Sequence, residues 1–360
     1  MSLIPQKRPR YFVVEKDTTP PRQWSPGSWD RSWPQDCRYY GQVFLEMEKT
    51  LEVPDLRIYM TWDVDRLPEY GDNIVAAVIG DECGLMPRYA RHVRAIIKTH
   101  RGAFPFLGIR RWQPFDRLRF LLAMKHLRNL ALHARSRLAA SRPPRDWPAP
   151  ARGKPLIINA PLGYALLEDV PMKTMRERPY HCFFAGLVAA APDRSASRKW
   201  FTIPKDEVRK IGREAMFRAV EEFEKKEPRF RFDGSVVSSP SLTSNSPDGR
   251  TYSQRMMDSK ICLAPRGSIV DSWRFFEGVR SGCLVITEPL PDEYYYQDAP
   301  VIQIDRWTEL ERVIQPFLDD DDALEVCRQR TLAYWRDRCG EAAFGAYLAR
   351  CINSGQVVTD

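Results

Sequence analysis

The chain has 360 residues, 43% of them hydrophobic and 28% charged, with a formal net charge of +8. This length and apolar fraction favour two domains with separate cores. No stretch approaches the about 20 apolar residues that span a bilayer, and the first residues (MSLIPQKRPRYF) lack the apolar core of a signal peptide. We therefore expect a cytoplasmic protein whose basic surface favours anionic partners.

The first third of the chain predicts alternating strands and helices. Residues 1 to about 36 are rich in Pro, Arg and Trp without periodicity, so we expect an extended arm there. Apolar runs then predict strands at 56–61, 73–79, 95–99 and 155–159, with a short helix at 87–92. Strands that alternate with helices indicate a parallel sheet covered on both faces.

Residues 115–141 form the longest helical pattern. Apolar residues recur every three or four positions, as Phe120, Met124, Leu127, Ala131, Ala134 and Leu138. Basic residues crowd the other positions, and Asp116 is the only acid. Two interpretations stay open: a domain helix with a solvated basic face, which we favour, or a basic amphipathic helix in peripheral contact with an anionic membrane.

The second half repeats the alternation after an expected linker at 167–177. Strands are predicted at 181–185, 230–237 and 301–304, and helices at 206–226, 252–260, 308–317 and 321–339. The eight cysteines show no C-x-x-C spacing, so neither a zinc site nor a disulfide framework is expected.

The segment 261–286 (ICLAPRGSIVDSWRFFEGVRSGCLVI) carries the clearest local pattern. An apolar strand at 261–264 ends at Pro265 and Gly267, and Asp271 and Ser272 are good N-caps for a helix over 273–280. Gly282 ends that helix, and a second buried strand follows at 283–286.

The predicted helix over 273–280 has an unusual charge at its start. Arg274 lies in the first turn, where the helix dipole disfavours a cation. An arginine beside open backbone N–H groups is typical of an anion site, and Glu277 shares its face at i+3. A phosphate at Arg274 and a ribose at Glu277 would fit a nucleotide. An ordinary surface Arg–Glu pair is the alternative.

Three groups of residues resemble the donor-site signature of exostosin-like glycosyltransferases. They are Pro265-x-Gly267, Arg274-x-x-Glu277 and Gly282-Cys283-x-Val285-Ile286. The strand-plus-glycine run from Arg178 to Gly186 and the segment Tyr252 to Lys260 resemble the same family. The resemblance covers the C-terminal half of the chain. It implies an α/β fold of the GT-B type, with two facing Rossmann-like domains, parallel sheets and an interdomain cleft.

The resemblance also implies a division of labour between the domains. Residues 1–172 would form the acceptor-side domain and residues 173–360 the nucleotide-sugar-binding domain, and it stays open whether the last helix packs back on the first domain. Ligands of doubly wound sheets bind at the carboxyl ends of strands. The predicted donor-binding residues are accordingly Gly186, Arg266, Gly267, Ser268, Ser272, Arg274 and Glu277.

Transfer with inversion needs a base that deprotonates the acceptor hydroxyl. Asp81 and Glu82 fit this role best because they follow a buried strand of the first domain. Asp63, Asp65 and His100 are rivals. Asp63-Val64-Asp65 also matches the D-x-D of metal-dependent glycosyltransferases, but we expect helix dipoles and arginines to replace a metal here.

The sequence therefore predicts a glycosyltransferase that uses a UDP-, GDP- or dTDP-sugar and requires no metal or other cofactor. A bacterial polysaccharide or lipid-linked glycan is the expected acceptor, with the protein cytoplasmic and in possible peripheral contact with the inner membrane face through the basic helix 115–141. Three alternatives stay open: a phage-type enzyme that glycosylates DNA bases, a non-catalytic binder of nucleotide-sugars or glycans, and a sugar-nucleotide epimerase.

Overall fold

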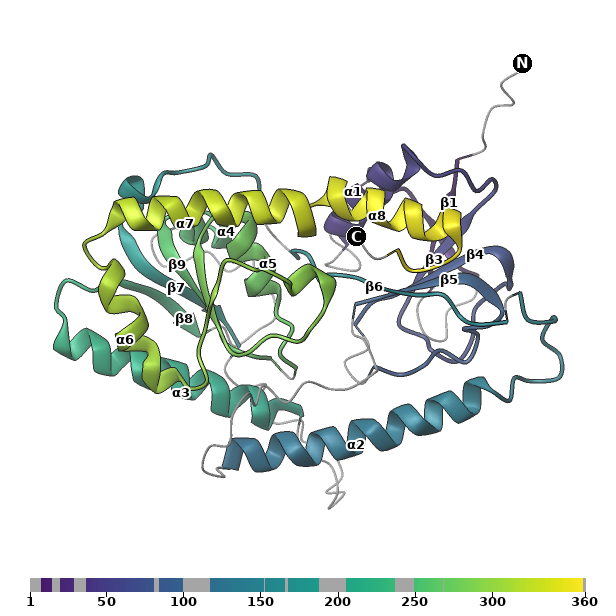
Figure 1. Cartoon of the computed structure of the whole chain (residues 1–360), viewed down its shortest axis with the longest axis horizontal. Coiled ribbons are helices and arrows are strands. Elements are labelled where there is room, and N and C mark those ends of the chain that lie inside the picture. Colours follow the sequence, from purple (N-terminus) through teal and green to yellow (C-terminus); the bar gives the residue numbers. More distant parts are fainter. Residues whose placement is uncertain are drawn as a thin grey trace. The chain divides into compact units, whose positions relative to one another are not determined.

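The computed structural model describes residues 8–14, 20–28, 37–80, 84–99, 117–151, 153–165, 168–187, 205–236, 249–267 and 269–358. These residues fold into two compact units (Figure 1). Unit 1 takes its described residues from Met1–Pro105, Leu127–Pro161 and Arg338–Asp360, and unit 2 from Phe106–His126 and Leu162–Asp337. The sequence prediction had placed a domain boundary between residues 172 and 173.

Unit 1 contains a sheet with the strand order β2-β1-β3-β4-β5-β6. Its strands are β1 (Arg10–Val14), β2 (Arg22–Trp24), β3 (Arg57–Thr61), β4 (Gly71–Val78), β5 (Val93–Lys98) and β6 (Ile157–Asn159). All neighbours pair in parallel except β1 and β2. Within the segment predicted as an extended arm, β1 and β2 are strands of this sheet, and β1 is held by its pairing with the distant β3 and not by a local pattern.

Helices α1 (Cys37–Glu48) and α8 (Glu341–Ser354) pack against each other within unit 1. The approach is close: a Cβ at Gly345 would lie 2.6 Å from Glu46 Cβ and 2.7 Å from the Val43 carbonyl oxygen. The Tyr39 hydroxyl donates to the Cys339 carbonyl at 2.6 Å. The C-terminal helix therefore belongs to the core of unit 1, although more than 290 residues separate it from α1 in the chain.

The predicted helix at 87–92 was wrong, whereas the long helix was found as α2 (Arg117–Ala140). Residues 88–92 form turns instead, closed by bonds from Ala90 N to Pro87 O and from His92 N to Tyr89 O. The Arg88 amide donates to Val64 O at 2.8 Å. The bond to the Val64 carbonyl therefore anchors the start of these turns to a neighbouring loop.

Unit 2 contains a second sheet with the order β11-β10-β9-β7-β8, and every neighbouring pair is parallel. Its strands are β7 (Tyr180–Gly186), β8 (Phe232–Val236), β9 (Ser259–Ala264), β10 (Leu284–Thr287) and β11 (Ile302–Gln303). The central strand β9 is buried along its whole length, as the apolar run predicts.

Helices cover both faces of this sheet. Figure 1 shows α3 (Lys205–Lys226) and α6 (Leu310–Ile314) along one face, and α4 (Tyr252–Met257) and α5 (Trp273–Arg280) along the other. Gly278 lets α5 lie close to the sheet, since a Cβ there would be 2.8 Å from Cys262 Cβ. The predicted α/β fold class, with two parallel-sheet units, is confirmed.

Short helical turns and the helix α7 complete unit 2. The 3-10 turns are η1 (Met175–Glu177), η2 (Tyr294–Tyr296), η3 (Trp307–Glu309) and η4 (Gln315–Phe317). Helix α7 (Asp321–Tyr334) continues into a π-helical turn, Trp335–Cys339. The predicted helix at 252–260 ends at Met257, because Ser259 already pairs with Tyr180 in the sheet. Among the described helices, none has the length and hydropathy needed to cross a bilayer.

Candidate functional site

The carboxyl ends of β7 and β9 bring several predicted donor residues together within unit 2. Gly186 ends β7, Arg266 and Gly267 follow β9, and Arg274 lies in the first turn of α5. Parallel strands place their carboxyl ends along one edge of the sheet, so loops and helix starts gather there. Ser268 lies outside the described residues.

Arg274 reaches from α5 to the end of β7. Its Nε donates to the Ala185 carbonyl at 2.7 Å, and its Cζ lies 4.9 Å from the centroid of the Phe184 ring. Ser272 was predicted to bind the nucleotide-sugar donor. Its hydroxyl caps α5 by accepting a hydrogen bond from the Arg274 amide at 3.3 Å. One hydrogen bond and one cation–π contact thus fix the guanidinium over the end of the strand.

Gly186 makes this placement of Arg274 possible. A Cβ at Gly186 would lie 2.0 Å from Arg274 Nη2 and 2.6 Å from its Cζ. Gly186 was predicted from the sequence as a residue that binds the nucleotide-sugar donor. In the structure the space beside its Cα is taken by the guanidinium. Gly267 is different, since among the described residues a Cβ there would meet only the Ile269 carbonyl oxygen, at 3.7 Å.

A second guanidinium, not foreseen from the sequence, approaches the same strand end from the opposite face. Arg213 of α3 is 5% exposed, and its Cζ lies 5.7 Å from the Phe184 ring centroid. It donates through Nη1 to the Leu187 carbonyl, while Nε has no hydrogen-bond partner among the described residues. Helices α3 and α5 therefore direct two arginines to one aromatic ring.

The two arginines make this point strongly electropositive. Burial, together with the nearby guanidiniums of Arg274 and Arg209, lowers the pKa of Arg213 to about 8. An arginine is normally charged at every physiological pH. The lowered pKa therefore shows that it is unfavourable to keep Arg213 charged while it is buried close to another guanidinium. An anion bound between Arg213 and Arg274 would remove that repulsion. The arrangement is chemically suited to a phosphate or diphosphate.

Arg266 is occupied elsewhere. It is 2% exposed and its Nε forms an ion pair with Glu288, which is 7% exposed and also accepts from Trp307 Nε1 at 3.0 Å. A Cβ at Gly212 of α3 would lie 3.2 Å from Arg266 Cγ. Of the two arginines predicted to bind the donor, Arg274 is the one that reaches the end of β7. Arg266 packs beneath α3.

Glu277 is buried and bonded at both oxygens. It is 1% exposed, Tyr252 donates its hydroxyl to Oε2 at 2.6 Å, and the Ala165 amide approaches Oε1 at 3.4 Å. Burial raises the pKa of this carboxyl, although Tyr252, Arg274 and Ala165 oppose the shift. The predicted ribose contact would thus have to use a carboxylate that also holds α4 and the segment at Ala165.

A depression lies in the loops that follow β10. Its volume is about 500 Å³, and its lining includes Leu290, Pro291, Asp292, Tyr296, Gln297 and Asp298. The Tyr296 hydroxyl donates to Asp271 Oδ1 at 2.7 Å, directly before the cap of α5. The depression is therefore tied to the same turn as Arg274. Carboxylates, an amide and an aromatic ring are side chains that suit a sugar.

The predicted base lies outside the described residues. Asp81, Glu82 and the rival His100 all fall there. The rival Asp63 caps the turn after β3, because its Oδ1 accepts from the amides of Asp65 at 2.7 Å and Arg66 at 3.3 Å. Within the described part of the chain, no three His, Cys, Asp or Glu side chains are grouped so that they could hold a metal ion.

Trp62 is the second residue that sequence reasoning missed. It follows β3 and remains 47% exposed. A Cβ at Gly80, where φ is +89°, would lie 3.1 Å from the Trp62 Nε1. An exposed indole at the carboxyl end of a strand offers a flat apolar surface for a ligand ring. The signal in the sequence was the Trp itself, directly after an apolar strand.

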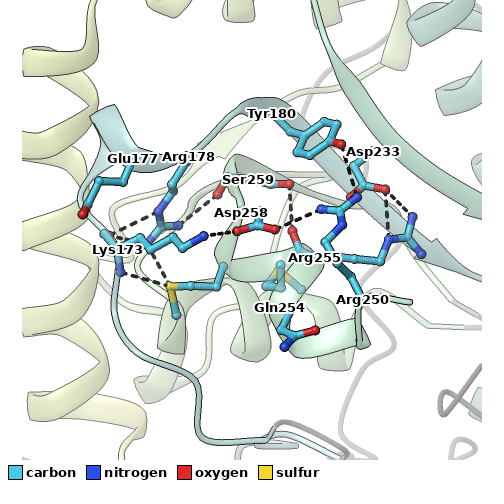
Figure 2. A network of polar contacts seen from close by, with 12 residues as sticks. Lys173, Glu177, Arg178, Tyr180, Asp233, Arg250, Gln254, Arg255, Asp258 and Ser259 are labelled. Carbon is cyan, nitrogen blue, oxygen red and sulfur yellow. Dashed lines mark hydrogen bonds and ion pairs between the residues drawn. The ribbon is translucent and has the colours of Figure 1, made fainter. Parts of the chain in front are cut away.

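A network of ion pairs holds α4, and hence Tyr252, against the sheet (Figure 2). Arg255 at the end of α4 pairs with Asp233 of β8, and Arg250 bridges Asp233 at 2.9 Å and Asp258 at 3.0 Å. Arg178 is 1% exposed and donates to the carbonyls of Ser259 at 2.9 Å and Ser281 at 2.8 Å.

The network lies where β7, β8 and β9 begin, so it supports the candidate site from the amino end of the sheet. Arg178 and Asp258 lie in the two segments, Arg178 to Gly186 and Tyr252 to Lys260, that resemble exostosin-like glycosyltransferases. Both serve the scaffold and not the ligand.

Comparison with solved structures found distant likenesses. TarM aligns over 88% of this chain and 58% of its own length, with 8% identity and a TM-score of 0.43. The glycosyltransferase SnogD from Streptomyces nogalater covers 91% of this chain and 85% of its own (10% identity, TM-score 0.33). AviGT4, a glycosyltransferase involved in avilamycin A biosynthesis, covers 98% and 99% (12% identity, TM-score 0.35).

The chain spans less than two thirds of the length of TarM. With TM-scores below 0.5, we transfer no residue role from these three proteins. No protein-family model matches the sequence, and a search of curated proteins also gives no match.

Proposed function

We propose that this chain is a glycosyltransferase whose nucleotide-sugar donor binds unit 2 at the carboxyl end of β7. The observation that carries the proposal is a pair of guanidiniums, Arg213 from α3 and Arg274 from α5, whose Cζ atoms lie 5.7 Å and 4.9 Å from the centroid of the Phe184 ring. Two cations held together at one strand end call for an anion with at least two charges, and a diphosphate supplies them. The residues around Arg274 resemble the donor-site signature of exostosin-like glycosyltransferases. We therefore infer that the anion is the diphosphate of a nucleotide-sugar.

In the proposed reaction the bond between the anomeric carbon and the diphosphate oxygen breaks, and a bond from that carbon to the acceptor oxygen forms. The electron pair of the broken bond leaves on the diphosphate, where Arg213 and Arg274 stabilise the developing charge without a metal. The acceptor proton passes to a base. Attack from the opposite side of the ring inverts the anomeric centre.

The depression at Leu290, Asp292 and Tyr296 is our candidate for the donor sugar. It adjoins the turn that caps α5, so a diphosphate at Arg274 would bring its sugar towards these side chains. Asp81 and Glu82 remain our candidates for the base. Asp81→Asn and Glu82→Gln should be tested singly. Loss of the base is expected to slow transfer by roughly 10²–10⁴-fold with nucleotide binding intact.

A thermal-shift screen across UDP, GDP, dTDP, CDP and ADP tests the binding half of the proposal. A nucleotide at 100 times its Kd stabilises the folded state by ~2.7 kcal/mol, which is readily measured. We expect Arg213→Met and Arg274→Met to remove most of the response. Arg280→Met is the matched control, because Arg280 lies on the same helix but pairs with Asp169 at 2.9 Å. A full response in both site variants would contradict the assignment.

Turnover distinguishes the enzyme from the other uses of the same site. Incubation with the accepted nucleotide-sugar is expected to release nucleoside diphosphate slowly by hydrolysis, and faster with a glycan acceptor. A chain that binds the donor without any release would be a binding protein. Conversion of the donor to an isomer without acceptor would indicate an epimerase. Preferred transfer to duplex DNA would indicate the base-modifying alternative.

A further inference from the structure

Helix α2 exposes an apolar stripe to solvent. Leu127 is 59% exposed, Leu138 54%, Phe120 50% and Met124 40%, and Ala131 and Ala134 are exposed as well. These six residues, which we call the α2 stripe, are the ones whose spacing marked a helical face in the sequence. All lie on one continuous helix, so the helical repeat aligns them.

The opposite face of α2 is the packed one. Leu122 and Lys125 are each 9% exposed and Asn129 is 5% exposed. At 3.6 residues per turn, these three positions lie about half a turn from the α2 stripe. The helix is thus buried through one face and presents a row of large apolar side chains on the other. Contiguous exposed apolar surface of this kind marks a site of interaction.

The charge on α2 indicates which class of partner the α2 stripe could bind. The helix (RLRFLLAMKHLRNLALHARSRLAA) contains six Lys and Arg residues and neither Asp nor Glu. On the helical repeat, Arg128 and Arg135 lie about 60–80° to one side of the stripe and Arg119 and Arg137 about 100° to the other. Cations therefore border the apolar row on both sides. This combination matches a surface with an apolar interior and anionic groups above it.

We infer that α2 binds the surface of an anionic lipid bilayer, with the α2 stripe among the acyl chains and its arginines at the headgroup phosphates. Duplex DNA would satisfy the arginines but would offer nothing to Phe120, Met124 and Leu127. A second copy of the helix would cover the stripe but would bring six further cations against these six. This inference does not depend on the proposed function, because α2 contributes none of the residues around Phe184.

Flotation of the full-length protein with vesicles tests the inference. The vesicles are phosphatidylcholine alone, or phosphatidylcholine with about 30 mol% phosphatidylglycerol. Binding is expected to be at least about tenfold stronger on the anionic vesicles at low salt and to fall as salt screens the arginines. The triple variant Phe120→Ser, Met124→Ser, Leu127→Ser and the pair Arg128→Glu, Arg135→Glu should each lose at least about tenfold.

The matched control is Val326→Ser with Val357→Ser, which removes exposed apolar residues (58% and 46% exposed) outside α2. It is expected to bind like the unmodified chain. The inference is overturned by equal binding to both vesicles, or by triple and charge variants that still bind normally. A dimer that the triple variant converts to monomer, without vesicle binding in the parent, would assign the stripe to self-association. Binding to duplex DNA that ignores the triple variant would assign the arginines to nucleic acid.

Discussion

Because Gly186 has no side chain, the guanidinium of Arg274 can occupy the small volume beside its Cα at the end of β7. We predict that Gly186→Ala shifts the guanidinium and breaks its bond to the Ala185 carbonyl. The displaced atoms are the end of a flexible side chain, so the free energy of unfolding should change by less than ~1 kcal/mol. Nucleotide affinity should fall about tenfold, which corresponds to ~1.4 kcal/mol of binding free energy. Calorimetric titration together with urea unfolding would separate the two effects.

Glu277 makes a pH-dependent contribution to stability. Burial raises the pKa of its carboxyl in the folded state, so between the unfolded and the folded pKa the folded chain holds more protons. The contribution of Glu277 to stability is fully present below the pKa that its carboxyl has in the unfolded chain. It is lost as pH rises through the raised pKa of the folded chain. Glu277→Gln cannot titrate and keeps an acceptor for the Tyr252 hydroxyl.

We therefore predict that the stability of Glu277→Gln, relative to the unmodified chain, increases as pH rises from 4 towards neutral (about 7). Urea unfolding at several pH values checks this. A difference that stays constant with pH would mean that the Glu277 carboxyl titrates normally.

At the scale of elements, the Arg266–Glu288 pair joins the sheet to α3. Both residues are at least nine-tenths buried, and Gly212 of α3 packs over the pair. Removing one partner leaves the other charge buried and alone, so Arg266→Met or Glu288→Gln should each lower the free energy of unfolding by ~3–5 kcal/mol. The double variant Arg266→Met, Glu288→Leu should recover much of that loss. If Arg266→Met abolished nucleotide binding without affecting stability, Arg266 would be a ligand residue after all.

The local sequence was enough to predict those elements whose first and last residues are marked by capping or helix-ending residues. The helix over 273–280 was predicted with its observed bounds because Ser272 caps it and Gly282, at φ +69°, ends it. The segment at 88–92 was wrongly predicted as a helix; it forms turns that are anchored through the Arg88 amide to the Val64 carbonyl, which is distant in sequence. Helix α2 was found, but the spacing of its apolar residues did not show that this face is exposed.

At the scale of the whole molecule, the candidate donor site belongs entirely to unit 2. We predict that a bound nucleotide slows amide hydrogen exchange at the end of β7, in the α3 turn around Arg213 and in the first turn of α5. Ligand contacts there stabilise the locally folded state against opening. Mass spectrometry of peptides with and without nucleotide measures this. Protection confined to unit 1 would place the nucleotide elsewhere.

The sequence by itself determined the α/β class, the buried parallel strands, the caps of α5 and the unusual position of Arg274, because each depends on neighbours within a few residues. It also exposed the basic character of α2, which is a matter of composition. Tertiary structure decided which arginine faces the strand end. Arg213 reaches Phe184 from α3 and Arg266 turns to Glu288 because of how helices pack on the sheet, and such packing joins residues too far apart in the chain for any local pattern to record.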